Sequence, residues 1–277
     1  CAAGTTNSIC RRAKSYVWPA IHPALCACGM EISMNFTDAL NEINVELDDS
    51  MEEALQKYYE LLVEWNKVMN LTAITEKDDV YVKHFLDSLA VKTVFDDKEY
   101  AKMLPDTNTA IKVIDIGTGA GFPGIPLKIA FPNVKVTLLD SLNKRIKFLN
   151  EVISTVGLND IEAIHGRAED YAREPDYRES YDLCVSRAVA NLSTLAEYCL
   201  PYVKTGGYFI SYKSGDIDDE LKTATHALKL LGAKTIGVKK LTLPGTDIER
   251  SFVIIKKMAH TDKKYPRKAG LPSSKPL

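Results

Sequence analysis

Over the first third of the chain, apolar residues recur with the period of a helix. The clearest stretch is Met51 to Met69, where Leu55, Tyr58, Leu62 and Trp65 fall on one face at steps of three and four residues. Aromatic residues in such a stripe usually pack in a core. We therefore predict a long amphipathic helix whose apolar face is buried.

A second helical stretch follows after a short break. Thr75 or Asp78 is expected to cap it, and its pattern continues to about Phe95. A polar connection that contains Pro105 comes next. These stretches predict a helical N-terminal region over residues 34–105.

From residue 106 the pattern changes to short apolar runs that alternate with helical stretches. The expected strands are residues 111–116, 134–139, 161–164, 183–186, 208–212, 233–241 and 251–257. The expected helices are residues 124–131, 141–156, 192–203 and 217–231. A turn at Gly206-Gly207 should precede the fifth strand, and Pro244-Gly245 should join the last two. The alternation predicts a doubly wound, mostly parallel α/β sheet with an antiparallel last strand, over residues 106–260.

The first strand of this sheet runs into a glycine-rich turn. Gly117, Gly119, Gly121 and Gly124 remove side chains where the backbone must turn tightly and approach a ligand. Their spacing also fits the fingerprint of a dinucleotide site. Asp115 lies at the strand's end, where a carboxylate would repel a pyrophosphate but attract the ammonium and sulfonium groups of S-adenosylmethionine. The stretch favours this methyl donor over a dinucleotide, with a turn that binds nothing as the remaining alternative.

Polar residues follow the next three strands, at the edge of an open α/β sheet where ligands bind. Asp140 could accept both ribose hydroxyls or cap a helix. Ala168 and Glu169 could hold adenine, although Glu169 also suits the first turn of a helix. Arg187 projects toward the same cleft and could pair with a ligand's carboxylate or phosphate, or with a surface acid.

The residues around the fourth strand narrow the methyl acceptor. Residues 185–188 read VSRA, which is not the Asn/Asp-Pro-Pro-aromatic turn of enzymes that methylate the adenine amine. Cys184 and Cys199 lie in apolar settings, so neither is expected to be the nucleophile of a cytosine-C5 enzyme. An acceptor that is already nucleophilic, such as guanine N7, needs neither feature, and catalysis would rest on positioning without a general base. His84, in an amphipathic helix, is expected to be structural.

Composition and charge indicate a partner class. A chain with 45% hydrophobic and 26% charged residues is typical of a globular protein, and we expect it to be cytoplasmic. The net charge is −2, but residues 256–277 hold seven lysines and arginines against the single acid Asp262. Such a basic end favours a polyanion partner, with a solvated terminus as the alternative.

The first 33 residues differ in composition from the rest. They hold four of the six cysteines, Cys1, Cys10, Cys26 and Cys28. The pair at 26 and 28 lacks the usual zinc spacing, and we expect no metal site. We interpret residues 1–33 as a leader outside the fold, with Met30 or Met34 as the true start and a cleaved signal as a weaker alternative.

Seven segments, from about Met34 to the C-terminus, together resemble the bacterial 16S ribosomal RNA (guanine-N7) methyltransferases, also called glucose-inhibited division protein B. The segments are residues 70–75 (NLTAIT), 83–89 (KHFLDSL), 115–127 (DIGTGAGFPGIPL), 138–149 (LLDSLNKRIKFL), 166–170 (GRAED), 185–190 (VSRAVA) and 265–277 (YPRKAGLPSSKPL). Their combination and order are far more specific than a glycine loop alone.

The resemblance implies a Rossmann-like class I methyltransferase fold that uses S-adenosylmethionine to methylate N7 of one guanine in 16S rRNA of the small ribosomal subunit. Gly117 and Phe122 would line the methionine end of the cofactor, and Arg187 would contact the cofactor or the target. Ala168 and Glu169 would contact the adenine, and Asp140 would contact the ribose. The expected phosphate contacts, inferred mostly from charge, are Lys144, Arg145, Lys213, Arg250, Lys263, Lys264, Arg267 and Lys268. We expect a monomer with no membrane partner.

The sequence leaves three other functions open. One is a methyltransferase that acts on another RNA, or on a small molecule or a protein; the last two targets would leave the basic end of the chain without a purpose. A nucleotide-binding oxidoreductase is opposed by Asp115. A non-catalytic ribosome-assembly factor would use the basic end but has no need of the glycine loop.

Overall fold

The computed structural model describes residues 34–101 and 110–277. Residues 34–277 form one compact unit. The predictions about the leader, with its four cysteines, and about Pro105 fall outside the described residues.

The N-terminal region is helical. Its elements are α1 (Phe36–Glu42), α2 (Asp49–Met69), α3 (Lys77–Val80), the π-helical turn η1 (Tyr81–Leu86), α4 (Asp87–Leu89) and α5 (Lys92–Phe95). In α2 the Asp48 side chain accepts a hydrogen bond from the Met51 amide, and Asn70 ends the helix in the left-handed conformation. Leu55, Tyr58 and Leu62 are buried, which confirms the predicted amphipathic helix.

The predicted start of the second helical stretch was wrong. Glu76, rather than Thr75 or Asp78, precedes α3, and it makes no side-chain capping bond. The backbone then passes from an α-helical turn into η1. A π-helical turn is rare and often marks a functional site, and sequence periodicity does not reveal it.

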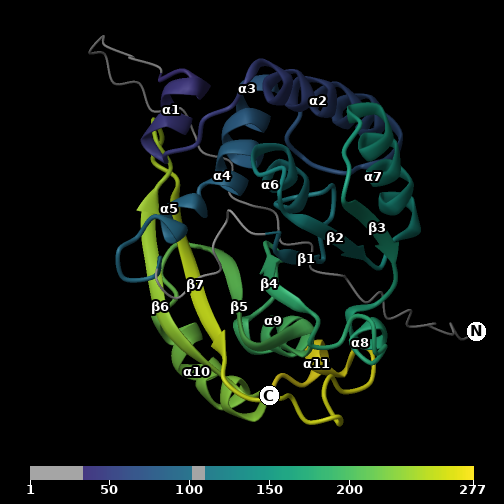
Figure 1. The fold of residues 1–277 in the computed structure, drawn as a ribbon, viewed down its shortest axis with the longest axis vertical. Coiled ribbons are helices and arrows are strands. Elements are labelled where there is room, and N and C mark those ends of the chain that lie inside the picture. The colour runs from purple at the N-terminus through teal and green to yellow at the C-terminus, as the bar shows by residue number, and fades with distance from the viewer. Residues whose placement is uncertain (1–33, 102–109) are drawn as a thin grey trace, which may run out of the picture. The chain divides into compact units, whose positions relative to one another are not determined.

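The sheet has seven strands in the order β3-β2-β1-β4-β5-β7-β6. The strands are β1 (Lys112–Ile116), β2 (Lys135–Asp140), β3 (Ile161–His165), β4 (Tyr181–Ser186), β5 (Val203–Ser214), β6 (Ala233–Thr242) and β7 (Glu249–Lys257). The first five run parallel, and β7 lies antiparallel between β5 and β6 (Figure 1). This confirms the predicted doubly wound sheet with an antiparallel last strand.

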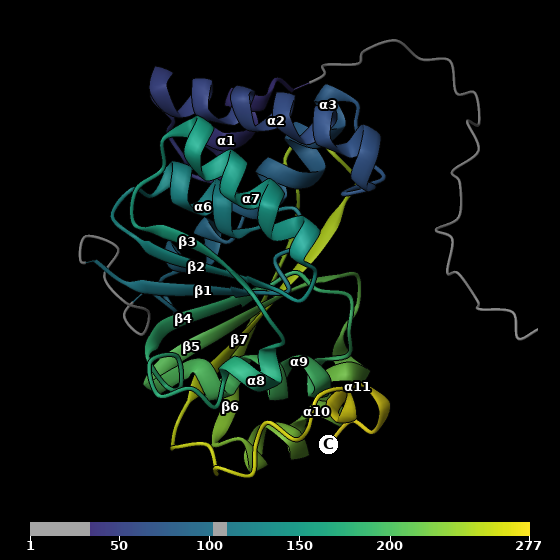
Figure 2. The same ribbon diagram turned by 90° about the vertical axis from the view of Figure 1, so that its right-hand side faces the viewer.

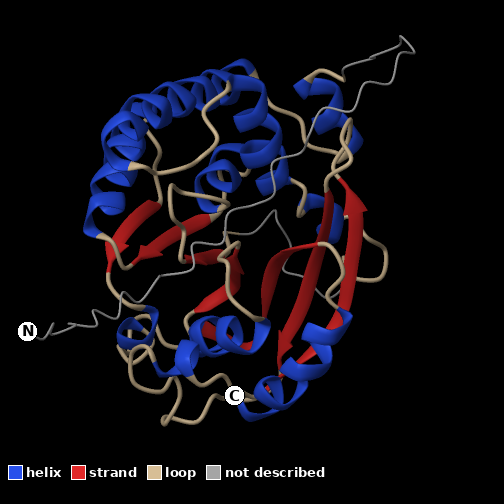
Figure 3. Cartoon of the chain, turned by 180° about the vertical axis from the view of Figure 1, so that it is seen from behind, coloured by secondary structure: helices blue, strands red, loops and turns tan. Residues whose placement is uncertain are grey.

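Helices cover both faces of the sheet. They are α6 (Gly124–Ala130), α7 (Asn143–Val156), α8 (Ala168–Tyr171), α9 (Leu192–Cys199), the 3-10 turn η2 (Leu200–Tyr202), α10 (Asp218–Leu230) and α11 (Leu271–Ser274). Helices α2, α6 and α7 lie on one side, and α8, α9 and α10 lie on the other (Figures 2 and 3). Neighbouring residues of β1 serve the two cores: Val113 packs into the first and Ile114 into the second.

The fifth strand is longer than predicted. It begins at Val203 and continues through the expected turn at Gly206-Gly207. The pairing with β4 is irregular there, because the partner of Tyr181 is Val203 whereas that of Leu183 is Tyr208. Gly206 has a φ of +90°, so the extra residues bulge within the strand instead of ending it. The helix before it accordingly stops at Cys199 and not at residue 203.

After β7 the chain turns back along the face that carries α8 and α9 (Figure 2). Residues 261–277, the expected basic tail, which we call the C-terminal segment, include the buried Tyr265 and Pro272. The Arg178 guanidinium donates to the carbonyls of Thr261 and Tyr265 at 2.7 and 3.0 Å. The basic end of the chain is therefore packed against the domain.

Candidate functional site

The glycine loop leaves the carboxyl end of β1 and leads into α6. Gly119 has a φ of +64° and faces open space, since a Cβ placed on it would meet nothing within 4 Å. A Cβ on Gly124 would lie 2.3 Å from the Leu138 side chain, so only glycine fits at this contact between helix and strand. The loop therefore exposes bare backbone at the sheet edge where ligands bind.

Asp115 holds this loop from inside. Its Oδ2 accepts hydrogen bonds from the Thr118 hydroxyl at 2.7 Å and from the Gly124 amide at 2.9 Å. Burial raises the pKa of Asp115 to about 6. The sequence argument placed this carboxylate opposite the positive groups of the cofactor, whereas the structure buries it completely as a loop-fastening group.

The other oxygen, Asp115 Oδ1, is buried and has no hydrogen-bond partner among the described residues. An unpaired buried carboxylate oxygen is costly, so it favours a donor that comes from outside the chain. The ammonium group of S-adenosylmethionine, directly or through a water molecule, has that chemistry. The glycine loop and Asp115 thus fit the cofactor that the sequence indicates.

Asp140 ties the end of β2 to the same loop. Its Oδ2 accepts from the Gly119 amide and from Arg145 Nη1, each at 3.0 Å, and its Oδ1 accepts from the Leu142 amide at 2.9 Å. The side chain is buried. Arg145, which the sequence assigned to RNA, is therefore the ion-pair partner of the residue expected at the ribose.

Ala168 and Glu169 open α8, directly after β3. The Tyr202 hydroxyl donates to the Ala168 carbonyl at 2.7 Å. The Glu169 side chain is buried, and its Oε1 accepts from the Gly270 amide at 2.8 Å. Both residues expected at adenine thus lie at the carboxyl edge of the sheet, and a residue of the C-terminal segment contacts one of them.

Arg187, after β4, lies at the centre of a polar cluster. Its Nη1 donates to Asp87 Oδ2 at 2.8 Å, and its guanidinium carbon sits 5.0 Å from the centre of the Phe122 ring. Arg250 Nε donates to the other oxygen of Asp87 at 2.6 Å. Asp87 is only 2% exposed, so one buried carboxylate holds two arginines.

His84 joins the π-helical turn to this cluster. Its ring stacks on Phe122 with 4.5 Å between centroids, and its Nε2 lies 2.9 Å from the Thr72 hydroxyl. Burial, followed by the nearby charge of Arg187, lowers the pKa of His84 to about 4. The imidazole is therefore neutral at physiological pH and contributes packing and a hydrogen bond.

Sequence reasoning did not single out Asp87, Thr72 or the hydroxyl of Tyr58. The Tyr58 hydroxyl donates to the Ala120 carbonyl, and its ring stacks 5.3 Å from that of Phe122, so α2 braces the glycine loop. Asp87 stands within the segment at 83–89, where an acid amid apolar residues was the available signal. Its two partners lie 100 and 163 residues away, which no local pattern reveals.

The structure divides the eight residues expected at RNA phosphates into two sets. Arg145, Lys213, Arg250 and Arg267 each pair with a carboxylate of the fold, respectively Asp140, Glu220, Asp87 and Glu197. The other four are exposed: Lys144, Lys263, Lys264 and Lys268. Lys264 of this second set pairs with the exposed Asp262 at 3.4 Å, and all four side chains lie at the surface, where phosphates can reach them.

Other features of the described residues add few candidates. Cys184 and Cys199 are buried, and burial raises the pKa of the Cys184 thiol, so neither is a reactive thiolate. In residues 34–101 and 110–277, no cluster of three or more metal-binding side chains occurs. None of the helices in those ranges has the length and apolar character to cross a membrane.

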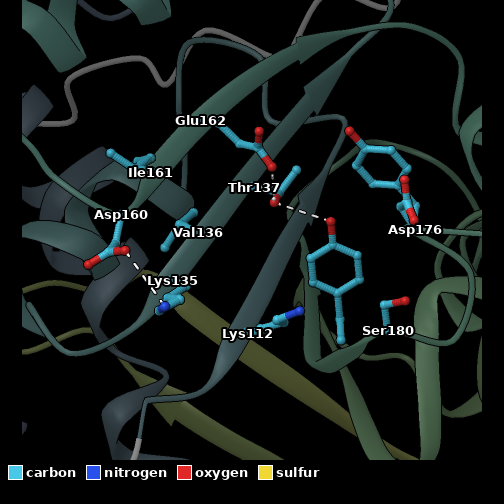
Figure 4. A pocket seen from close by; sticks show the side chains of 11 residues that line it. Lys112, Lys135, Val136, Thr137, Asp160, Ile161, Glu162, Asp176 and Ser180 are labelled. Atoms are coloured by element: carbon cyan, nitrogen blue, oxygen red, sulfur yellow. Dashed lines mark hydrogen bonds and ion pairs between the residues drawn. The ribbon is translucent and has the colours of Figure 1, made fainter.

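A polar cavity of about 440 Å³ lies at the opposite edge of the sheet (Figure 4). It is lined by the first residues of the parallel strands, among them Lys112, Lys135 and Tyr181. The Tyr181 hydroxyl donates to Thr137, which in turn donates to Glu162 at 3.0 Å. Ligands of open α/β sheets bind at the carboxyl ends of the strands, so this cavity is separate from the site at the glycine loop.

Comparison with known proteins agrees with the geometry. Residues 51–252 match the family model described as rRNA small subunit methyltransferase G. The chain is 51% identical over 248 residues to the ribosomal RNA small subunit methyltransferase G of Lachnoclostridium phytofermentans, covering 90% of this chain and 98% of that protein. It is 49% identical to the protein of the same name from Alkaliphilus metalliredigens, covering 90% and 100%.

Among solved structures, TYW2 of M. jannaschii in complex with AdoMet aligns with a TM-score of 0.45 and 17% identity, covering 57% of this chain and 74% of that chain. A likeness of this size is too weak to bear on function. The family model, in contrast, spans residues 51–252, which include every residue of the loop and of the Arg187 cluster, and the relatives cover 90% of the chain. The chain therefore belongs to the rRNA small subunit methyltransferase G family.

Proposed function

We propose that this protein transfers a methyl group from S-adenosylmethionine to N7 of a guanine in 16S rRNA of the small ribosomal subunit. The observation that carries the proposal is the glycine loop, fastened by buried Asp115, lying beside a cluster in which the pKa of His84 is lowered and its ring is held between Phe122 and the Thr72 hydroxyl. Guanine N7 bears a lone pair and no proton, so it is the acceptor that such a site can serve.

The cofactor would lie along the carboxyl ends of β1 to β4. When bound, it supplies an activated methyl group. The residues of the chain would bind and orient the cofactor. The bare backbone at Gly117, Gly119 and Gly121 would admit its methionine end. Asp140 would face its ribose, and Ala168 and Glu169 would face its adenine. Arg145 occupies one oxygen of Asp140 at 3.0 Å, so a ribose hydroxyl would share or displace that bond.

The acceptor would enter beside Arg187. Asp87 fixes the guanidinium over Phe122, where its remaining N–H groups are able to donate to an oxygen of the target base or of the cofactor carboxylate. His84 and Tyr58 keep the Phe122 ring in place from two sides. Catalysis then rests on alignment of N7 with the methyl group.

The exposed lysines would hold the rRNA backbone. Lys263, Lys264 and Lys268 lie on the C-terminal segment, and Lys144 lies at the start of α7. Contacts of this kind position an RNA without reading its sequence. We further propose that the protein works as a monomer in the cytoplasm; sedimentation of the purified chain would test the first point and fractionation of cells the second.

The experiment is methyl transfer from labelled S-adenosylmethionine to small subunits that lack the modification, with naked 16S rRNA in parallel. The expected product is 7-methylguanosine, identified by mass spectrometry of the digested rRNA. Label in another nucleoside would refute the acceptor assignment. Cofactor binding without transfer to either RNA would refute the substrate while leaving the cofactor site in place.

A further inference from the structure

The C-terminal segment reaches the site through one hydrogen bond. The Gly270 amide donates to Glu169 Oε1 at 2.8 Å, although the two residues are 101 positions apart. The Glu169 side chain is 6% exposed, so its carboxylate cannot turn freely into solvent. The direction of this carboxylate therefore depends on where the C-terminal segment lies.

A buried ion pair fastens that segment to α9. Glu197 is 0% exposed, and its two oxygens accept from Arg267 Nε at 2.9 and 3.1 Å and from Nη2 at 2.6 Å. The Arg267 amide donates to Glu197 Oε1 at 2.7 Å as well. On the other side, Arg267 Nη2 donates to the Lys275 carbonyl at 2.8 Å, which closes the turn that carries Gly270. Arg267 thus sets the position of Gly270 through its guanidinium and its backbone amide.

Both acids act on the same neighbouring side chain. Burial raises the pKa of Tyr198, and the charges of Glu169 and of Glu197 raise it further. Arg267 is the cation that compensates Glu197. Its removal would leave the Glu197 carboxylate buried without a compensating cation.

We propose that Arg267 is a positioning residue for the cofactor: by fastening the C-terminal segment to Glu197, it places the Gly270 amide against Glu169 and so orients the carboxylate that binds adenine. This inference rests on the proposed function, in which Glu169 faces adenine. It gives Arg267 a role distinct from that of the exposed lysines on the same segment.

The test compares Arg267→Met with Lys275→Met, which removes one positive charge from the same segment at an exposed side chain. Binding of S-adenosylhomocysteine and of 5′-methylthioadenosine, which lacks the amino-acid part, is measured by calorimetry. Loss of one charge-assisted hydrogen bond corresponds to about a tenfold change in affinity. Arg267→Met should weaken both ligands by about this same factor, and Lys275→Met should weaken neither.

Steady-state kinetics distinguish a loosened adenine contact from a general loss of structure at the active site. With Arg267→Met, KM for S-adenosylmethionine should rise while kcat at saturating cofactor stays unchanged, because only the adenine contact is loosened. If Arg267→Met does not fold, the pair Glu197→Gln with Arg267→Met removes both buried charges, and a chain ending at Lys268 removes Gly270 directly. Both should show the same loss for the two ligands.

Unchanged affinity for both ligands in a folded Arg267→Met protein, or in the chain ending at Lys268, would overturn the inference. Weakening of S-adenosylhomocysteine alone would also overturn it, since the effect would then lie at the methionine end. If the unsubstituted chain binds neither ligand, the proposed cofactor function itself fails, and the inference falls with it.

Discussion

Replacing Asp87 by Asn tests whether the Arg187 cluster is built as described. Asp87 is 2% exposed and accepts from Arg187 at 2.8 Å and from Arg250 at 2.6 Å. The amide of Asn has one acceptor oxygen, so it satisfies one guanidinium and turns an NH₂ group toward the other. The substitution thus removes one charge-assisted bond and leaves two cations facing each other.

A charge-assisted hydrogen bond contributes about 1.5–3 kcal/mol, and breaking a fully buried ion pair costs about 3–5 kcal/mol. The two arginine side chains are 20% and 19% exposed, so water relieves part of the repulsion. We therefore expect a loss of about 2–3 kcal/mol in the free energy of unfolding. For a chain of this size that loss lowers Tm by roughly 5–10 °C.

The matched control is Asp79→Asn, which makes the same chemical change in α3, shortly before Asp87 in the chain. Asp79 pairs with Lys83 at 2.7 Å, but both side chains are well exposed, so its loss should cost at most about 0.5 kcal/mol. Urea unfolding gives both free energies, and methyl transfer at saturating cofactor gives kcat. Equal stabilities for the two variants, or an unchanged kcat for Asp87→Asn, would refute the role assigned to the cluster.

The site yields further predictions for Asp115, the exposed lysines and His84. Asp115→Ala should abolish cofactor binding in calorimetry while circular dichroism shows a folded protein. Because the folded pKa of Asp115 is raised to about 6, the intact protein should lose about 2 kcal/mol of stability as pH rises from 4 to 6, and Asp115→Asn should lack that loss. Replacing Lys263, Lys264 and Lys268 by Ala should lower the slope of log K for RNA against log salt by about 2–3, and an unchanged slope would remove the segment from the RNA site. The pKa of His84 is lowered to about 4, so this residue should not titrate between pH 6 and 8. The dependence of kcat/KM on pH should therefore have the same shape in that range for the intact protein and for His84→Asn.

Much of the fold is readable in the chain itself. The stripe of α2 and the alternation of apolar runs with helical stretches are local patterns, because burial on one face forces a period of 3.6 residues and burial on both faces forces a continuous apolar run. The glycine loop is local as well, since backbone that must adopt positive φ and approach a ligand tolerates no side chain. Seven motif segments in order then identify the type of protein, and the family match over residues 51–252 and the close relatives confirm that family.

Roles of charged residues depended on the tertiary structure instead. Judged by charge alone, four of the cations look the same as the exposed lysines: Arg145, Lys213, Arg250 and Arg267. Each of them pairs with an acid of the fold, and three of these four acids are buried. The order of the strands decides which distant elements meet, and therefore whether a cation faces solvent or an acid. Breaking a buried ion pair costs several times more free energy than breaking an exposed one.

The bulge in β5, the π-helical turn around His84 and the contact of Gly270 with Glu169 share the same cause. Each arises because packing across many residues outweighs a local preference of a few tenths of a kcal/mol. The sequence by itself determined the sheet, the cofactor loop and the family. Only the tertiary structure decided which charges pair within the fold, which remain exposed, and which distant segment contacts Glu169.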